Sequence, residues 1–72
     1  MSNFADNLKN LRSIKGTPQK DLSLLLGVTI RQYQRYEAGA SEPNINGLIA
    51  LADYFDVSID YLVGRSDDPG RR

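Results

Sequence analysis

The sequence contains no cysteine, no histidine and no tryptophan. Without cysteine there is no disulfide framework, and without histidine or cysteine the usual zinc sites and the thiol or serine–histidine catalytic pairs are excluded. The lack of histidine also argues against a pH switch of the usual kind. We therefore expect no metal, no cofactor and no enzymatic activity, and we expect the protein to work in a reducing cytosol.

Long apolar runs are missing as well. The longest ones, Leu24–Leu26 and Leu48–Ala52, are far shorter than the roughly 20 residues that a bilayer requires. Residues 2–10 lack the basic start and apolar centre of a signal peptide. We expect a soluble, cytoplasmic protein, and a chain of 72 residues is expected to form one small domain.

Charge of one sign is not in excess, because nine Lys and Arg balance nine Asp and Glu. The two signs are nevertheless separated along the chain. Residues 1–36 carry six basic and two acidic side chains, whereas residues 37–72 carry three basic and seven acidic ones. Such an asymmetry can give one face an attractive potential for phosphate while the whole molecule stays near neutral.

The spacing of apolar residues predicts helices throughout and no strand. A first helix is expected to end at Lys15–Gly16, and a second to start with Thr17 as its cap and Pro18 as its first residue and to end at Gly27. The expected inward positions are Phe4, Leu8, Leu11 and Ile14 in the first helix, and Leu22, Ser23, Leu25 and Leu26 in the second.

Only Gly27–Val28 separates the second helix from the next cap, Thr29. Gln32, three residues later, completes the pattern of a capping box. Two short helices joined by so tight a turn are expected to cross steeply with Val28 between them, as in a helix-turn-helix.

Three further features complete the expected all-α, five-helix domain of residues 1–64. Gly39 should close the third helix, Asn44 should cap a fourth, and Ser58 should open a short fifth at Ile59–Val63. The fourth helix overrides a turn signal at Asn46–Gly47. Its inward positions are Leu48, Leu51, Ala52 and Phe55, that of the fifth is Leu62, and residues 65–72 are expected to form a frayed polar tail.

The third helix has two different faces. Tyr33, Tyr36 and Ala40 share the inward one, and Ile30, Arg31, Gln34 and Arg35 share the outward one. Arginine can bond guanine O6 and N7, glutamine can bond adenine N6 and N7, and an aliphatic group can cover a thymine methyl. The alternative is an ordinary solvated face, because Arg and Gln are good helix formers.

Other residues favour structural interpretations. Tyr33 and Tyr36 are expected to pack in the core with their hydroxyls at its edge, rather than to stack on bases. Lysines on helix faces are usually solvated, although Lys9, Lys15 and Lys20 could approach phosphates. The aspartates of the second half have the spacing of neither a calcium loop nor a carboxylate pair, and solvated positions are expected for them.

Three segments, "LKNLRSIKG", "PQKDLSLLLGVTIRQYQRYEAG" and "PNINGLIALADYFDVSIDYLVG", resemble successive parts of the lambda-repressor and Cro-like (XRE-type) helix-turn-helix family. The resemblance covers about residues 4–64. It implies a DNA-binding domain in which Arg12 and Glu37 form a structural salt bridge. It further implies contacts with the DNA bases by Ile30, Arg31, Gln34 and Arg35. Contacts with the phosphates of the DNA backbone are implied for Gln19, Lys20, Thr29 and Asn44.

The sequence departs from the family pattern at three places. Pro18 stands where a Ser or Thr cap is usual, Ala38 replaces a common asparagine, and the loop Ala40–Glu42 carries an acid in place of a frequent base. At Ala38 and in the loop the grip on the DNA backbone is expected to be weaker, and together with the acidic second half of the chain this predicts modest affinity for a single copy.

The resemblance implies a transcriptional regulator, most simply a repressor, that binds a two-fold operator as a homodimer. Half-sites should lie about 34 Å apart, and the candidate dimer surface surrounds Ile59, Tyr61 and Val63. No membrane and no small-molecule ligand are expected. The alternative is a protein-interaction module of the antitoxin or antirepressor type that uses the same fold.

Overall fold

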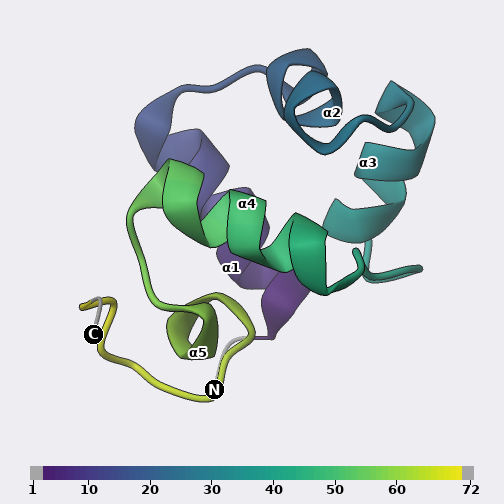
Figure 1. The fold of residues 1–72 in the computed structure, drawn as a ribbon. Coiled ribbons are helices and arrows are strands. Elements are labelled where there is room, and N and C mark those ends of the chain that lie inside the picture. The colour runs from purple at the N-terminus through teal and green to yellow at the C-terminus, as the bar shows by residue number, and fades with distance from the viewer. Residues whose placement is uncertain (1–2, 71–72) are drawn as a thin grey trace.

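The computed structural model describes residues 3–70, and its regular structure consists of five α-helices joined by short turns (Figure 1). They are α1 (Phe4–Lys15), α2 (Gln19–Leu26), α3 (Ile30–Glu37), α4 (Ile45–Phe55) and α5 (Ile59–Leu62). No strand occurs within residues 3–70, which confirms the all-α fold. Residues 1–2 of the expected domain and 71–72 of the expected tail lie outside the described residues.

Side-chain caps start four of the five helices. Asn3, Thr29, Asn44 and Ser58 each accept a hydrogen bond from the backbone N–H three residues later, as such caps do. The expected cap of α2 is wrong, because Pro18 is the N-cap residue and no side chain caps this helix. Thr17 is buried instead, and its hydroxyl is 2.9 Å from that of Tyr54.

Two helix ends differ from the predicted ones. α3 ends at Glu37 with Ala38 as its C-cap residue, and Ala40 therefore lies exposed beyond the helix instead of on its inward face. α5 ends at Leu62, one residue earlier than expected, and Val63 is its C-cap residue.

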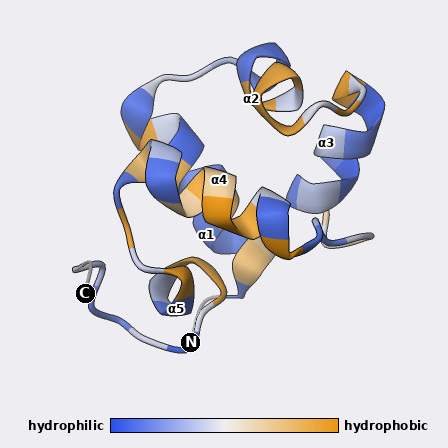
Figure 2. Cartoon of the chain, in the orientation of Figure 1, coloured by the Kyte–Doolittle hydropathy of each residue, from blue (hydrophilic) through white to orange (hydrophobic). Residues whose placement is uncertain are grey.

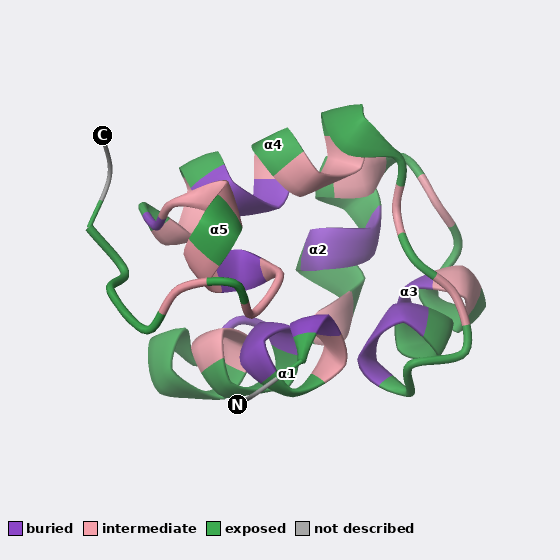
Figure 3. Cartoon of the chain, turned by 90° about the horizontal axis from the view of Figure 1, so that it is seen from below, coloured by how far each residue is buried: buried purple, intermediate pink, exposed green. Residues whose placement is uncertain are grey.

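The core lies where the helices meet (Figure 3). It contains most of the predicted inward positions. Nine hydrophobic residues are buried: Phe4, Leu8, Leu22, Tyr33, Tyr36, Leu51, Ala52, Val57 and Leu62. Leu11, Leu26, Val28, Leu48 and Phe55 pack against them while partly buried. The apolar surface of α4 is conspicuous in Figure 2, in contrast with the mostly hydrophilic α3.

Two predicted inward residues are exposed, Ile14 to 83% and Leu25 to 44%. On α2 the inward face passes through Leu22, Ser23 and Leu26, and Leu25 flanks that face at the surface of the helix. At the end of α1 Lys15 is exposed as well, and its ammonium lies 4.9 Å from the centre of the Tyr54 ring. Local spacing cannot tell the flank of a buried face from its centre.

One buried polar contact ties α1 to α5. The Asn7 side chain, 8% exposed, donates hydrogen bonds to the backbone oxygens of Tyr61 at 3.0 Å and Leu62 at 3.3 Å. These carbonyl groups lie at the end of α5, where a helix lacks its regular backbone donors, and the Tyr61 oxygen also accepts the backbone N–H of Gly64 at 3.1 Å. Asn7 thereby anchors the shortest helix of the domain.

Residues 65–70 turn back onto α5 rather than fraying. The backbone N–H of Arg65 donates to the Asp60 oxygen at 2.8 Å, and that of Ser58 donates to the Pro69 oxygen at 3.2 Å. Figure 1 shows this segment beside α5. Within residues 3–70 no helix has the length and apolar character needed to cross a membrane.

Gly47 explains how the turn signal at Asn46–Gly47 is overridden. It lies in the first turn of α4, and a Cβ atom added there would be 2.8 Å from Cβ of Pro43. The proline ring before the helix thus needs a residue without a side chain at this position. The glycine serves close packing here and not a turn.

Gly47→Ala should therefore destabilise the protein, although Ala is normally better than Gly inside a helix by about 1 kcal/mol. We expect a loss of about 1–3 kcal/mol in the free energy of unfolding, because overpacking shifts the backbone. Chemical denaturation followed by circular dichroism measures it. Asn46→Ala, one residue earlier in the same helix and exposed, is the control and should change little. A stabilised Gly47→Ala variant would contradict this packing argument.

Candidate nucleic-acid interface

The predicted turn between α2 and α3 is present. Gly27 ends α2 in the left-handed conformation with φ 69°, which glycine adopts without steric cost. Val28 follows and packs partly buried against the core, and Thr29 caps α3. Figure 1 shows α2 nearly end-on and α3 from its side, so the two helices cross steeply. This is the predicted helix-turn-helix arrangement.

The two faces of α3 differ as predicted. Tyr33, Tyr36 and Glu37 are buried, and the buried part of α3 faces the rest of the domain in Figure 3. The outward residues Ile30, Arg31, Gln34 and Arg35 are all exposed. An isoleucine that is 42% exposed between long polar side chains fits an interface that includes an apolar contact.

Three cations around this face are available to a partner. Lys20 lies exposed in the first turn of α2, and Arg31 and Arg35 lie exposed on α3. Within residues 3–70 the sole ion pair joins Arg12 to Glu37. None of the three therefore has an internal counter-ion, which favours interaction with an anionic ligand.

Two of the residues that are expected to contact the DNA backbone also cap helices. Thr29 accepts the N–H of Gln32 at 3.0 Å, and Asn44 accepts that of Gly47 at 2.8 Å. Both are exposed. The second half of the predicted capping box is wrong, because the Gln32 amide instead donates to the Ser41 hydroxyl at 2.9 Å.

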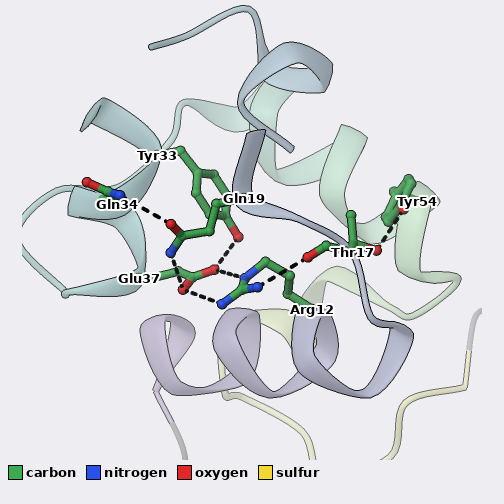
Figure 4. Close-up of polar contacts among 7 residues, drawn as sticks. All are labelled: Arg12, Thr17, Gln19, Tyr33, Gln34, Glu37 and Tyr54. Carbon is green, nitrogen blue, oxygen red and sulfur yellow. Dashed lines mark hydrogen bonds and ion pairs between the residues drawn. The ribbon is translucent and has the colours of Figure 1, made fainter. Parts of the chain in front are cut away.

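The carboxylate of Glu37 joins three helices behind the outward face (Figure 4). Nε and Nη2 of Arg12, from α1, donate to its two oxygens. The Tyr33 hydroxyl donates to Oε2 at 2.6 Å, and Nε2 of Gln19, the first residue of α2, donates to Oε1 at 3.1 Å. The structure thus confirms the predicted pair of Arg12 and Glu37 and adds two donors to it. We call Arg12, Gln19, Tyr33 and Glu37 the Glu37 cluster.

Burial and hydrogen bonding shift the pKa values in the Glu37 cluster in opposite senses. Burial by itself raises the pKa of Glu37, but the hydrogen bonds from Arg12, Tyr33 and Gln19 outweigh it and hold that pKa below its ordinary value. The bond to Glu37 raises the pKa of Arg12. Burial, together with the bond to Glu37, raises the pKa of Tyr33 well above its ordinary value. The cluster therefore holds a carboxylate, a guanidinium and a neutral phenol at neutral pH.

Tyr33 differs from its predicted environment in one respect. It packs in the core, with its ring 6.3 Å from that of Tyr36 in an edge-to-face arrangement. Its hydroxyl, however, is buried against Glu37 and does not lie at the edge. A hydroxyl that is fully enclosed in this way requires a hydrogen-bond partner, which the carboxylate provides.

Sequence reasoning missed the connection from the Glu37 cluster to the outward face. Nε2 of Gln34 donates to Oε1 of Gln19 at 3.2 Å, so Gln19 lies between Glu37 and Gln34 (Figure 4). The residues are 15 positions apart, and no local pattern pairs them.

Within residues 3–70 no group of three or more acidic side chains could hold a metal ion.

Comparison with known proteins gives a consistent result. The family model described as "Helix-turn-helix" matches residues 8–62. The transcriptional regulator YqaE of Bacillus subtilis is 39% identical over 66 residues, which cover 90% of this chain and 57% of YqaE. The phage CTXphi transcriptional repressor RstR of Vibrio cholerae is 32% identical over 60 residues, covering 83% of this chain and 54% of RstR.

A solved structure has the same fold. The crystal structure of a transcriptional regulator from Listeria innocua superposes with a TM-score of 0.84 at 42% identity, covering 86% of this chain and 58% of that one. The chain therefore spans little more than half the length of these three similar proteins.

Arg12→Met removes the main partner of a carboxylate that is 7% exposed. We expect the free energy of unfolding at neutral pH to fall by about 3–5 kcal/mol, as when one member of a buried ion pair is deleted. Because the pKa of Glu37 is depressed in the folded protein, this carboxylate stabilises the wild type at pH values above the ordinary glutamate pKa of about 4.3. The stabilisation is lost as the pH falls further. The difference between variant and wild type should therefore shrink on acidification.

Denaturation curves between neutral and acidic pH measure this difference. Lys9→Met, on the exposed side of the same helix, is the control and should lie within about 0.5 kcal/mol of wild type. A loss from Arg12→Met that is small, or independent of pH, would show that the Glu37 cluster does not hold the helices together.

Proposed function

Because the chain belongs to the lambda-repressor and Cro-like helix-turn-helix family of transcriptional regulators, we propose that it binds double-stranded DNA in a sequence-specific manner and represses transcription. The observation that carries the proposal is the outward face of α3, which is exposed while the opposite face is buried. The similarity to RstR, a transcriptional repressor, supports the direction of regulation.

The base contacts are assigned to the four outward residues of α3. Arg31 and Arg35 are long donors that form no ion pair with any described residue, which suits the O6 and N7 acceptors of guanine. Gln34 offers an amide for adenine, and Ile30 an apolar contact for a thymine methyl. An eight-residue helix fits the major groove, which is about 12 Å wide.

The DNA backbone contacts are assigned to residues around the starts of the helices. Gln19 and Lys20 open α2, Thr29 caps α3 and Asn44 caps α4. Free N–H groups and the helix dipole make such positions favourable for phosphate. These contacts position the domain on the duplex and carry no sequence information by themselves.

One domain of this size reads only a few base pairs, so we propose a homodimer on a two-fold operator. Half-sites about 34 Å apart would place two copies of α3 in successive major grooves. Ile59, Tyr61 and Val63 are partly buried against the core of the domain, and the dimer surface around them stays a prediction. The proposed location is the cytoplasm.

Selection of bound fragments from random duplex DNA, followed by affinity measurements at two salt concentrations, tests this function. Arg31→Ala or Arg35→Ala should weaken binding to the selected site by about 1–3 kcal/mol and relax the preference at one position. Lys20→Ala is the matched control, because loss of a phosphate contact should weaken all sequences alike and reduce the salt dependence.

Two outcomes would contradict the proposal. Equal losses on selected and random DNA for both arginine variants would remove them from base recognition. The absence of duplex binding even at low salt would favour a protein-interaction module on the same fold.

A further inference from the structure

The Gln19 side chain connects the buried part of the domain to its outward face. It is partly buried at the start of α2, its Nε2 donates to Glu37 and its Oε1 accepts from Gln34. Figure 4 shows the three side chains in a row, with Gln34 outermost. A residue that only contacted phosphate would have no need of either partner.

The hydrogen-bonding groups of Glu37, Gln19 and Gln34 fix the direction of the two glutamine amides. A carboxylate has no hydrogen to donate, so the Gln19 group facing Glu37 must be its NH2. Oε1 of Gln19 then faces Gln34, and an acceptor can be met only by the NH2 of Gln34. Gln34 is left with a free carbonyl oxygen and one free N–H.

We propose that Gln19 is a positioning residue that fixes the direction of the Gln34 amide, so that Gln34 selects adenine over guanine. The proposal rests on the proposed function. A free carbonyl oxygen and a free N–H match the N6 donor and N7 acceptor of adenine. Guanine presents two acceptors, O6 and N7, in the same place.

An unrestrained glutamine could serve either base, because its amide can turn and present both hydrogens of its NH2 to guanine. Turning the amide of Gln34 in this structure would bring its oxygen against that of Gln19, and two acceptors repel each other. The Glu37 carboxylate, which can only accept, prevents Gln19 from turning in response, because Oε1 of a turned Gln19 would face a Glu37 oxygen. The second Nε2 hydrogen of Gln19 remains available for a phosphate, so both roles are compatible.

The test begins from the motif that the wild-type protein selects from random duplex DNA. The base pair read by Gln34 is the position at which Gln34→Ala loses its preference. Dissociation constants are then measured for duplexes with adenine or guanine at this position. Gln19→Met, which keeps the length of the side chain but removes its hydrogen bonds, should lower the adenine-to-guanine affinity ratio by about five-fold or more.

Three companion variants make the result specific. Gln19→Asn retains the amide but shortens its reach and should show the same loss of selectivity. Gln19→Met should have no additional effect on selectivity in the Gln34→Ala background, because the two residues act as one unit. Lys20→Met, the neighbouring residue on α2, should weaken both duplexes alike and leave the ratio unchanged.

The free protein provides a readout that does not depend on DNA. In ¹H–¹⁵N spectra, Gln19→Met should shift the side-chain NH2 signals of Gln34 and leave those of Gln32, which bonds to Ser41, in place. Unmoved Gln34 signals, or an unchanged adenine-to-guanine ratio in Gln19→Met, would overturn the inference. A motif with no adenine preference attributable to Gln34 would also overturn it, and no duplex binding at all would overturn the proposed function with it.

Discussion

The arrangement of the domain depends on the buried carboxylate of Glu37. Its two oxygens accept four hydrogen bonds, two from Arg12 and one each from Tyr33 and Gln19. These donors come from α1, α2 and α3, so a single group fixes the mutual position of three helices. Such a carboxylate is costly to bury, and it is tolerated because its acceptor sites are filled.

This constraint also bears on the outward face of α3. Glu37 and Gln34 lie on the same short helix, and Gln19 links one to the other across the helix-turn-helix. Because the scaffold behind the long polar side chains is rigid, these side chains lose less conformational entropy when they bind a partner. The neutral overall charge does not prevent binding to an anionic ligand, since Lys20, Arg31 and Arg35 are exposed and have no counter-ion among residues 3–70.

Much of the fold and of the outward face of α3 could be predicted from the sequence, because the sequence patterns that determine them are local. Caps at Thr29, Asn44 and Ser58 need only the residue and the turn that follows it. The division of α3 into inward and outward faces follows from helical periodicity alone. The pairing of Arg12 with Glu37 spans 25 positions and came instead from the family resemblance.

The wrong and missed predictions have a different origin. They concern residues whose environment is determined by tertiary contacts, which local sequence patterns do not reveal. Thr17 looks like a cap, but its hydroxyl is held by Tyr54, 37 positions away. Leu25 has helical spacing from Leu22 but lies beside the buried face of α2. The link from Gln19 to Gln34 depends on the crossing of two helices, and the position of Gly47 depends on the ring of Pro43.

The proposed DNA-binding surface consists of the start of α2 and the outward face of α3. Mapping the backbone amide shifts of the ¹⁵N-labelled protein upon addition of a short duplex at low salt tests it most directly. The account predicts that the largest changes cluster at residues 19–20 and 29–35. Changes centred on α4 and α5, with α3 unaffected, would contradict it.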